Sequence, residues 1–238
     1  MDDLSTKIQA VRDRIRCAAE RAGRDPSDVR LVAATKYVEA SRVLDAIRVG
    51  LPICGENRWQ EAQAKMQAVG ERGDVEWHFI GRLQRRKLKW LVGRFNLIHS
   101  VESLEQAEEI QRRAHERRTS QAVLLEVNVG GEESKGGFSP DALPSAVSQI
   151  AAFPSVCVQG LMTVPPWNPD PELMRPYFRR LKQLAELIGS LPLRRVHMHE
   201  LSMGMSNDFE IAVEEGATLV RVGTALFGPR REPVTAES

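Results

Sequence analysis

Short apolar runs alternate with amphipathic stretches along almost the whole chain. The first run, RLVAATK at 30–36, leads into a polar turn and then into apolar residues at helical spacing, and this order recurs. The runs predict strands at 30–36, 51–57, 76–82, 96–101, 122–129, 156–164, 196–204 and 218–228. Strands that alternate with helices of about ten to fifteen residues indicate βαβ units and a parallel sheet.

An amphipathic helix is predicted before the first strand, over 4–22, where Ile8, Val11 and Ile15 share one face and Gly23 supplies a stop. Further helices are predicted at 39–49, 58–70, 83–91, 103–118, 140–152, 172–189 and 207–215. Ser103 with Gln106 has the spacing of a capping box, and Asn207 with Glu210 offers a looser version.

Eight strands with intervening helices predict an α/β fold, a (β/α)₈ barrel with an extra N-terminal helix. The alternative is a doubly wound open sheet. No Gly-x-Gly-x-x-Gly follows the first predicted strand, so the barrel is favoured. We expect one domain over 1–229 and a short flexible tail at 230–238, because 238 residues suit a single barrel.

Composition excludes several classes of partner. The net charge of +1 gives no global field toward nucleic acid or an acidic membrane, and no apolar stretch is long enough to span a bilayer. The start of the chain lacks the basic and apolar blocks of a signal peptide, and the three cysteines have no framework spacing. We therefore expect a cytoplasmic protein without a nucleic-acid or membrane partner.

A basic stretch runs from Arg82 to Lys89. A solvated helix face is the usual meaning of such a run, and a polyanion site is the alternative.

The side chains that could react or bind a ligand lie at the carboxyl ends of the predicted strands. Barrel enzymes build their active sites at this mouth of the barrel. In strand order the predicted set is Lys36, Glu56, Asn57, Gly81, Ser100, Glu102, Asn128, Met162, Ser202, Arg221, Gly223 and Thr224.

Lys36 stands at the end of the apolar first strand. A lysine there can cap the strand and extend its ammonium group outward. A desolvated lysine instead loses part of its preference for the charged form, and the neutral amine attacks carbonyls. Schiff-base chemistry at Lys36 is the sharper prediction.

Gly223 and Thr224 are expected to end the last strand and begin a helical turn at the usual phosphate position of such barrels, where backbone N–H groups face an anion, and Ser202 adds a hydroxyl. An ordinary Gly-Thr turn is the alternative. Arg221 points the same way and requires an acceptor, either a carboxylate such as Glu200 or an atom of a ligand. A lysine nucleophile opposite a phosphate cradle suggests a phosphorylated aldehyde, and pyridoxal 5′-phosphate (PLP) fits.

The histidines indicate no metal site. His197 and His199 share a strand face, but no third ligand is placed by spacing and the cysteine spacings do not suit zinc. We therefore predict no metal. His78 is expected to be a half-buried, hydrogen-bonded side chain.

The motifs LVAATKYV, GENRWQEA, WHFIGRLQRRK, GLMTVPP and LSMGMSNDFEIAVEEGATLVRVGTALFG resemble those of the PLP homeostasis family, single-domain relatives of the alanine racemase barrel. The resemblance covers residues 5–229 and implies a Schiff base on Lys36, with Asn57 beside the cofactor and Met162 near its ring. It further implies phosphate binding by Ser202, Gly223 and Thr224, and Arg221 facing the pyridine nitrogen. Arg82, Arg85 and Arg86 depart from the family pattern.

The resemblance implies a PLP carrier in vitamin B6 and amino-acid homeostasis that has no catalytic residue and passes PLP to apo-enzymes. A guanidinium at the ring nitrogen cannot accept a proton, which weakens the electron sink of PLP. Tyr37 and Tyr177 are the only tyrosines, and neither is predicted to act as a second base. A PLP-dependent racemase or decarboxylase is one alternative, and a protein- or nucleic-acid-binding module is another. We expect a monomer, because the chain ends ten residues after the last predicted strand and leaves no room for the racemase's second domain.

Overall fold

Eight parallel strands close into a barrel in the order of the sequence, with β8 paired to β1. The structure is a computed structural model, and it describes residues 3–132 and 135–229, so the predicted tail at 230–238 lies outside the described residues. The strands are β1 (Arg30–Ala34), β2 (Ile53–Glu56), β3 (Glu76–Phe79), β4 (Leu97–Val101), β5 (Gln121–Glu126), β6 (Val156–Met162), β7 (Val196–Ser202) and β8 (Leu219–Val222). The predicted (β/α)₈ barrel is confirmed.

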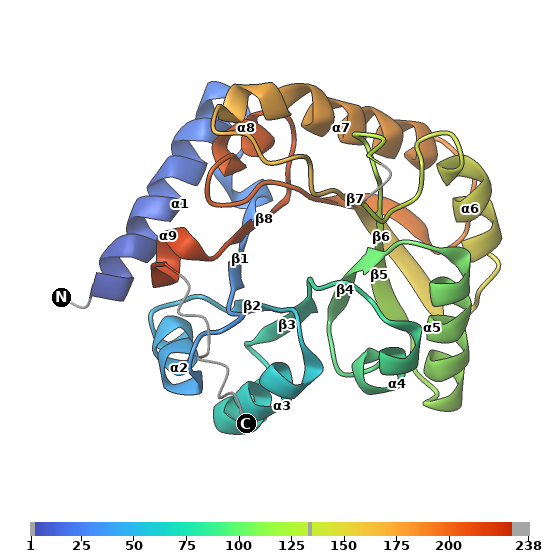
Figure 1. The fold of residues 1–238 in the computed structure, drawn as a ribbon, viewed down its shortest axis with the longest axis horizontal. Helices are drawn as coiled ribbons and strands as arrows, with labels where there is room; N and C mark the ends of the chain where they lie inside the picture. The colour runs from blue at the N-terminus through green and yellow to red at the C-terminus, as the bar shows by residue number, and fades with distance from the viewer. Residues whose placement is uncertain (1–2, 133–134, 230–238) are drawn as a thin grey trace, which may run out of the picture.

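Helices ring the strands, and the N-terminal helix α1 (Asp3–Arg21) packs on α8 (Phe209–Glu214) and α9 (Thr224–Phe227) (Figure 1). The other α-helices are α2 (Ala40–Arg48), α3 (Trp59–Val69), α4 (Leu88–Leu91), α5 (Leu104–Glu116), α6 (Leu143–Ile150) and α7 (Arg175–Gly189). Short 3₁₀ helices are η1 (Pro26–Asp28), η2 (Arg85–Lys87) and η3 (Pro171–Met174). None of the helices in these described ranges is long and apolar enough to cross a bilayer.

Most strands read as nearly continuous apolar runs because both of their faces are buried, whereas β7 exposes His197 and His199 on one face. A small cluster fills the barrel interior: Val32, Ile53, Leu97, Leu124, Met162 and Leu219. The larger core lies between the strands and the surrounding helices, where Leu31 and Ala33 of β1 alternate with the inward-facing Val32. Alternation along β1 therefore directs Lys36 to the same side as Val32, toward the barrel mouth.

Two predicted elements end or begin differently in the structure. The strand predicted over 218–228 is wrong beyond Val222, because the chain turns at Gly223 (φ −121°, ψ −71°) into α9. The single helix predicted over 83–91 is replaced by η2 and the short α4, since Gln84 has an extended backbone (φ −115°, ψ 122°).

One predicted cap is confirmed and the other is wrong. At α5, the Gln106 backbone N–H donates to Ser103 Oγ at 3.3 Å, and the Gln106 side chain accepts from the Glu102 N–H at 3.0 Å. At α8, the N-cap residue is Asp208, whose carboxylate accepts from the Met205 N–H at 2.6 Å. Asn207 instead donates to the Asn168 carbonyl at 3.1 Å. The N-cap position of α8 is therefore occupied by the buried Asp208, one residue after the predicted Asn207.

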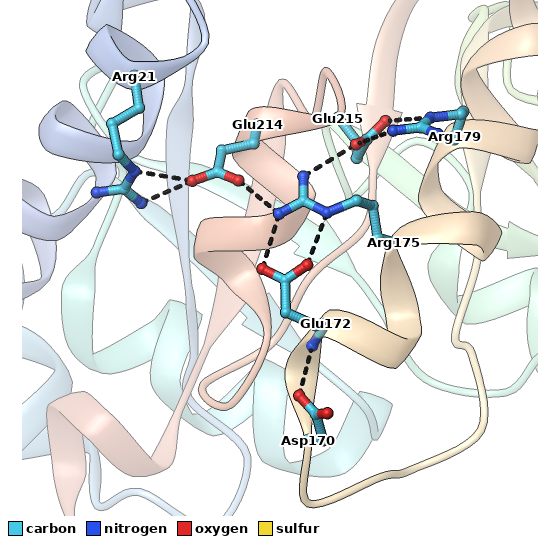
Figure 2. A network of polar contacts seen from close by, with 7 residues as sticks. All are labelled: Arg21, Asp170, Glu172, Arg175, Arg179, Glu214 and Glu215. Carbon is cyan, nitrogen blue, oxygen red and sulfur yellow. Dashed lines mark hydrogen bonds and ion pairs between the residues drawn. The ribbon is translucent and has the colours of Figure 1, made fainter.

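An ion-pair network ties α8 to its neighbours on two sides (Figure 2). Arg175 of α7 lies 2.8 Å from Glu214 and 3.0 Å from Glu215, both at the end of α8, and 2.8 Å from Glu172. Arg21 of α1 reaches Glu214 at 2.8 Å, and Arg179 reaches Glu215 at 2.9 Å. Each pair alone contributes about 0–1 kcal/mol to the stability of the fold. The carboxylates shared between two arginines therefore act chiefly on the orientation of α8. The network holds α8, which follows the loop after β7, against α1 and α7.

Candidate functional site

Lys36 lies at the carboxyl-terminal mouth of the barrel, two residues beyond β1, and is half-buried. Because β1 is paired with both β2 and β8, Asn57 follows the neighbouring strand on one side and Gly223 the strand on the other. A Cβ on Gly223 would lie 3.3 Å from the Ala34 carbonyl oxygen, so this turn packs directly against the end of β1. The fold thus brings together the predicted lysine and the predicted phosphate turn.

Helix α3 holds the backbone on both sides of Lys36. Tyr37 has a left-handed backbone (φ +62°), and its N–H donates to the Glu61 carboxylate at 3.0 Å. On the other side, the Lys65 ammonium donates to the Thr35 carbonyl at 2.6 Å. A side chain other than glycine rarely adopts positive φ unless its surroundings impose it. The two contacts from α3 therefore fix the peptide that carries Lys36.

A buried ion pair supports this arrangement. Lys65 Nζ donates to Glu56 Oε1 at 2.7 Å, and the Thr35 hydroxyl donates to the same oxygen. The side chain of Glu56 is fully buried, and burial raises the pKa of its carboxyl above the ordinary value despite the Lys65 ammonium beside it. Removing either partner would leave a desolvated charge next to the site.

Arg221 of β8 is buried inside the barrel. One terminal nitrogen donates to the Ser202 carbonyl at 2.8 Å and to Ser202 Oγ, and the other donates to the Thr163 carbonyl at 2.9 Å. Burial lowers the pKa of the guanidinium to about 10, so it stays charged at neutral pH. Glu200, the carboxylate proposed as its acceptor, bonds instead to Arg30 and Thr218. That alternative is wrong.

Ser202 and His99 meet in the barrel interior. Ser202 Oγ lies 2.9 Å from His99 Nδ1, and the serine is fully buried. His99 Nε2 and His78 Nδ1 are hydrogen-bonded at 3.0 Å. Sequence reasoning placed His78 in a half-buried setting, whereas only 1% of its surface is exposed, and it did not single out His99. The available signal was an imidazole in the middle of the apolar run LIHSV.

A second serine lies nearer to the phosphate turn than Ser202 does. Ser206, in the loop after β7, accepts a hydrogen bond at 3.5 Å from the Ala225 N–H in the first turn of α9. Its side chain is half-buried, and it follows Gly204, whose positive φ of +90° redirects the loop. Ser206 was missed because the motif LSMGMS contains two serines and the strand pattern favoured the first.

Asn57 and Met162 occupy opposite sides of the mouth. The side-chain oxygen of Asn57 is buried and has no hydrogen-bond partner in the described structure. A Cβ on Gly81 would lie 2.5 Å from the Asn57 carbonyl, so the glycine is needed for this approach. Met162 is 3% exposed and reaches both the barrel interior and a cavity at the mouth.

That cavity has a volume of about 300 Å³ and gathers several predicted strand-end residues: Gly81, Ser100, Glu102, Asn128 and Met162. It also contains Glu126 at the end of β5, which the sequence did not single out. Burial, and then the nearby Glu102 charge, raise the pKa of the Glu126 carboxyl. A larger cavity of about 510 Å³ lies at the opposite mouth, beneath α1.

Two further candidates from the sequence are the His197 and His199 pair and the basic stretch. His197 and His199 stack with ring centroids 5.5 Å apart, and among the described residues no group of three or more His, Cys, Asp or Glu side chains could hold a metal ion. Most of the predicted basic stretch lies in η2 and α4, and Arg82, which precedes them, lines the mouth cavity at 3.6 Å from Glu102.

Comparison with known proteins agrees along nearly the full chain. The family model described as alanine racemase, N-terminal domain, matches residues 6–231. The pyridoxal phosphate homeostasis protein of Aquifex aeolicus (strain VF5) is 47% identical over 228 residues, covering 94% of this chain and 97% of that protein. Its namesake in Escherichia coli (strain K12) is 36% identical over 236 residues, covering 97% and 98%.

Solved structures agree in fold. PipY of Synechococcus elongatus PCC7942, solved with PLP bound, superimposes with a TM-score of 0.81 at 32% identity and covers 95% of this chain and 100% of its own. An alanine racemase from Clostridium difficile 630 has a TM-score of 0.74 at 15% identity, covering 99% of this chain but 58% of its own, so it shares the barrel alone.

Proposed function

Because the chain belongs to the family of pyridoxal phosphate homeostasis proteins, with an alanine racemase N-terminal domain barrel, we propose that it binds PLP through a Schiff base on Lys36. It would bind PLP reversibly in the cytoplasm and so take part in the homeostasis of vitamin B6 and amino acids. It would do so without robust catalysis. The observation that carries this proposal is the adjacency of Lys36 to the Gly223 turn across the β1–β8 pair.

The residues at the mouth fit such a cofactor. Asn57 presents a buried oxygen to which none of the residues in 3–132 and 135–229 donates a hydrogen bond, and a buried acceptor of this kind is costly unless a ligand or water meets it. The Gly223 turn lacks a Cβ where the chain approaches β1, and α9 begins there with backbone N–H groups that no earlier turn can bond. An amine, an anion cradle and an unsatisfied acceptor therefore share one mouth.

Each residue then has a distinct part. Lys36 supplies the amine, Gly223 and Thr224 supply backbone donors to the phosphate, and Asn57 and Met162 contact the ring side. The Ser206 hydroxyl takes the phosphate position expected of Ser202, since Ser202 bonds to Arg221 and His99. Ser202 then acts by holding Arg221, whose guanidinium faces the ring nitrogen.

The proposal of weak catalysis rests on two features. PLP stabilises carbanions best when its ring nitrogen is protonated, and a guanidinium that only donates hydrogen bonds disfavours that state. Tyr37 is turned outward by its left-handed backbone, with 37% of its surface exposed, and its N–H is bound by Glu61. It is therefore poorly placed to act as the second base of a racemase.

The carrier proposed here is a monomer of one domain over 1–229, and its partners are PLP-accepting apo-enzymes. A nucleic-acid partner is not proposed, since the net charge is +1 and part of the basic stretch is offset by Glu102.

Trapping with borohydride tests the Schiff base. Purified protein incubated with PLP should show visible absorbance, and reduction should leave a phosphopyridoxyl group on the peptide that contains Lys36. The label should map to that peptide at one group per chain, because the other groups of the site converge there. Colourless protein, or a label spread over exposed lysines such as Lys7 and Lys89, would overturn the proposal.

A racemase or decarboxylase is a second candidate, favoured by Glu126. Its carboxyl lines the cavity beside Met162 and has a raised pKa, which is typical of acid–base residues. We expect amino acids incubated with PLP-loaded protein in deuterated water to show no rapid α-proton exchange. Rapid exchange that Glu126→Gln removes would establish an enzyme instead, with Glu126 as its acid–base group.

A further inference from the structure

Four consecutive hydrogen bonds cross the barrel interior from Arg221 to Glu76. Arg221 Nη1 donates to Ser202 Oγ, which lies 2.9 Å from His99 Nδ1. His99 Nε2 lies 3.0 Å from His78 Nδ1, and His78 Nε2 lies 3.1 Å from the Glu76 carboxylate. The side chains of Ser202, His99 and His78 are almost completely buried, so water does not compete for these contacts.

Arg221 and Glu76, the end groups of this hydrogen-bond chain, fix the direction of every hydrogen bond in it. A guanidinium only donates and a carboxylate only accepts, whereas a hydroxyl and a neutral imidazole do both. Glu76 must receive its proton from His78 Nε2, which leaves His78 Nδ1 to accept from His99 Nε2. His99 Nδ1 must then accept the hydroxyl proton of Ser202. The same order follows when the chain is traced from Arg221.

Burial keeps both imidazoles neutral, as this direction requires. Desolvation lowers the pKa of His78, and it lowers the pKa of His99 further, helped by the charges of Arg221 and Arg30. Glu76 stays ionised, since its hydrogen bond with His78 lowers its pKa. Of the charged groups that act on the two rings, Glu76 and Glu200 favour protonation of His78 while Arg30 opposes it.

The hydrogen-bond chain supplies part of the polar environment of the Arg221 guanidinium. Its hydrogen bonds go to two carbonyls and one hydroxyl, and the Glu126 and Asp208 carboxylates act on it only through space. Ser202 Oγ can accept from Arg221 in a fixed direction only while its own proton is held by His99. Without that acceptor, the hydroxyl proton loses its hydrogen-bond partner and the hydroxyl loses its fixed orientation.

We propose that His99 is a positioning residue for Arg221: with Ser202 and His78 it forms a one-way hydrogen-bond chain that sets the guanidinium at the cofactor mouth and joins it to Glu76 at the opposite mouth. The functional half rests on the proposed function, because it assigns Arg221 to the ring nitrogen of bound PLP. The Glu76 end of the hydrogen-bond chain is accessible, since Glu76 and Arg30 line the cavity beneath α1.

Histidine tautomers test the chain directly and need no cofactor. Long-range proton–nitrogen spectra of nitrogen-15-labelled protein at about pH 7 should show His78 and His99 neutral and protonated at Nε2. His197 and His199, which are exposed, serve as internal controls for the assignment of the two buried rings. A proton on Nδ1 of either buried ring, or an imidazolium at neutral pH, would overturn the chain.

Two variants of His99 test the positioning role. His99→Phe keeps the ring volume without an acceptor, and PLP should bind about tenfold more weakly with a shifted absorbance maximum. His99→Asn offers an oxygen near the position of Nδ1 and should recover most of the affinity. Gln121→Leu is the matched control, because Gln121 is buried in the barrel wall and bonds only to backbone near the opposite mouth.

The outcomes separate positioning from stability. Both His99→Phe and Gln121→Leu should lower Tm, and only the first should change the PLP affinity and spectrum. Equal PLP affinity in the two variants would reject the positioning role. If the wild type formed no adduct at Lys36, the proposed function would fail, while the tautomers would still decide whether the chain exists.

Discussion

Lys36→Ala is expected to abolish the visible absorbance of the PLP-loaded protein completely and to remove the borohydride-stable label. In the proposed site, the Lys36 amine is the group that would form a covalent bond to the aldehyde. The remaining proposed contacts, at Gly223, Thr224 and Asn57, would hold the phosphate and ring only non-covalently. Absorbance titration with PLP, followed by peptide mapping after reduction, measures both losses.

Two controls separate the amine from charge and from general lysine reactivity. Lys36→Arg keeps the positive charge but not the nucleophile, so it should be as colourless as the alanine variant. Lys7→Ala removes an exposed lysine paired with Asp3 and should leave the spectrum unchanged. Residual colour in Lys36→Ala, with a label at another lysine, would contradict the assignment of the Schiff base.

Lys65→Met is expected to lower the free energy of unfolding by about 3–5 kcal/mol. The methionine leaves the Glu56 carboxylate fully buried, with the Thr35 hydroxyl as its remaining partner. An unpaired charge in that position costs far more than the lost attraction, because it cannot regain its water. Chemical denaturation of the wild type and variant at neutral pH gives the difference.

A double variant identifies the cause of the loss. Lys65→Met combined with Glu56→Leu removes both charges and should recover most of the stability, since apolar replacements of buried pairs are often neutral or better. Lys7→Met, at an exposed pair, should change stability by about 0.5 kcal/mol or less. A double variant as unstable as Lys65→Met alone would show that the lost volume and the lost hydrogen bond to the Thr35 carbonyl, rather than the unpaired carboxylate, dominate.

Periodicity predicted the barrel because most strands are apolar on both faces, while each helix is apolar on one. The ends of the elements were less accurate: Gly223 turns the chain where the apolar run TLVRVGTALFG continues. The run remains apolar beyond the strand because Leu226 of α9 is also buried in the core. Hydrophobicity reports burial, and it does not distinguish a strand from the helix that follows it.

The sequence by itself determined the barrel and the position of Lys36 at the end of the first strand, since these depend on local pattern and on the parallel order of strands. Only the tertiary structure decided the partners of the buried polar groups. It assigned Ser202 to Arg221 and His99, brought Ser206 to α9, and enclosed Lys65 with Glu56 behind Lys36. Those pairings join residues far apart in the chain, and donor geometry in a packed interior, rather than spacing along the sequence, selects among them.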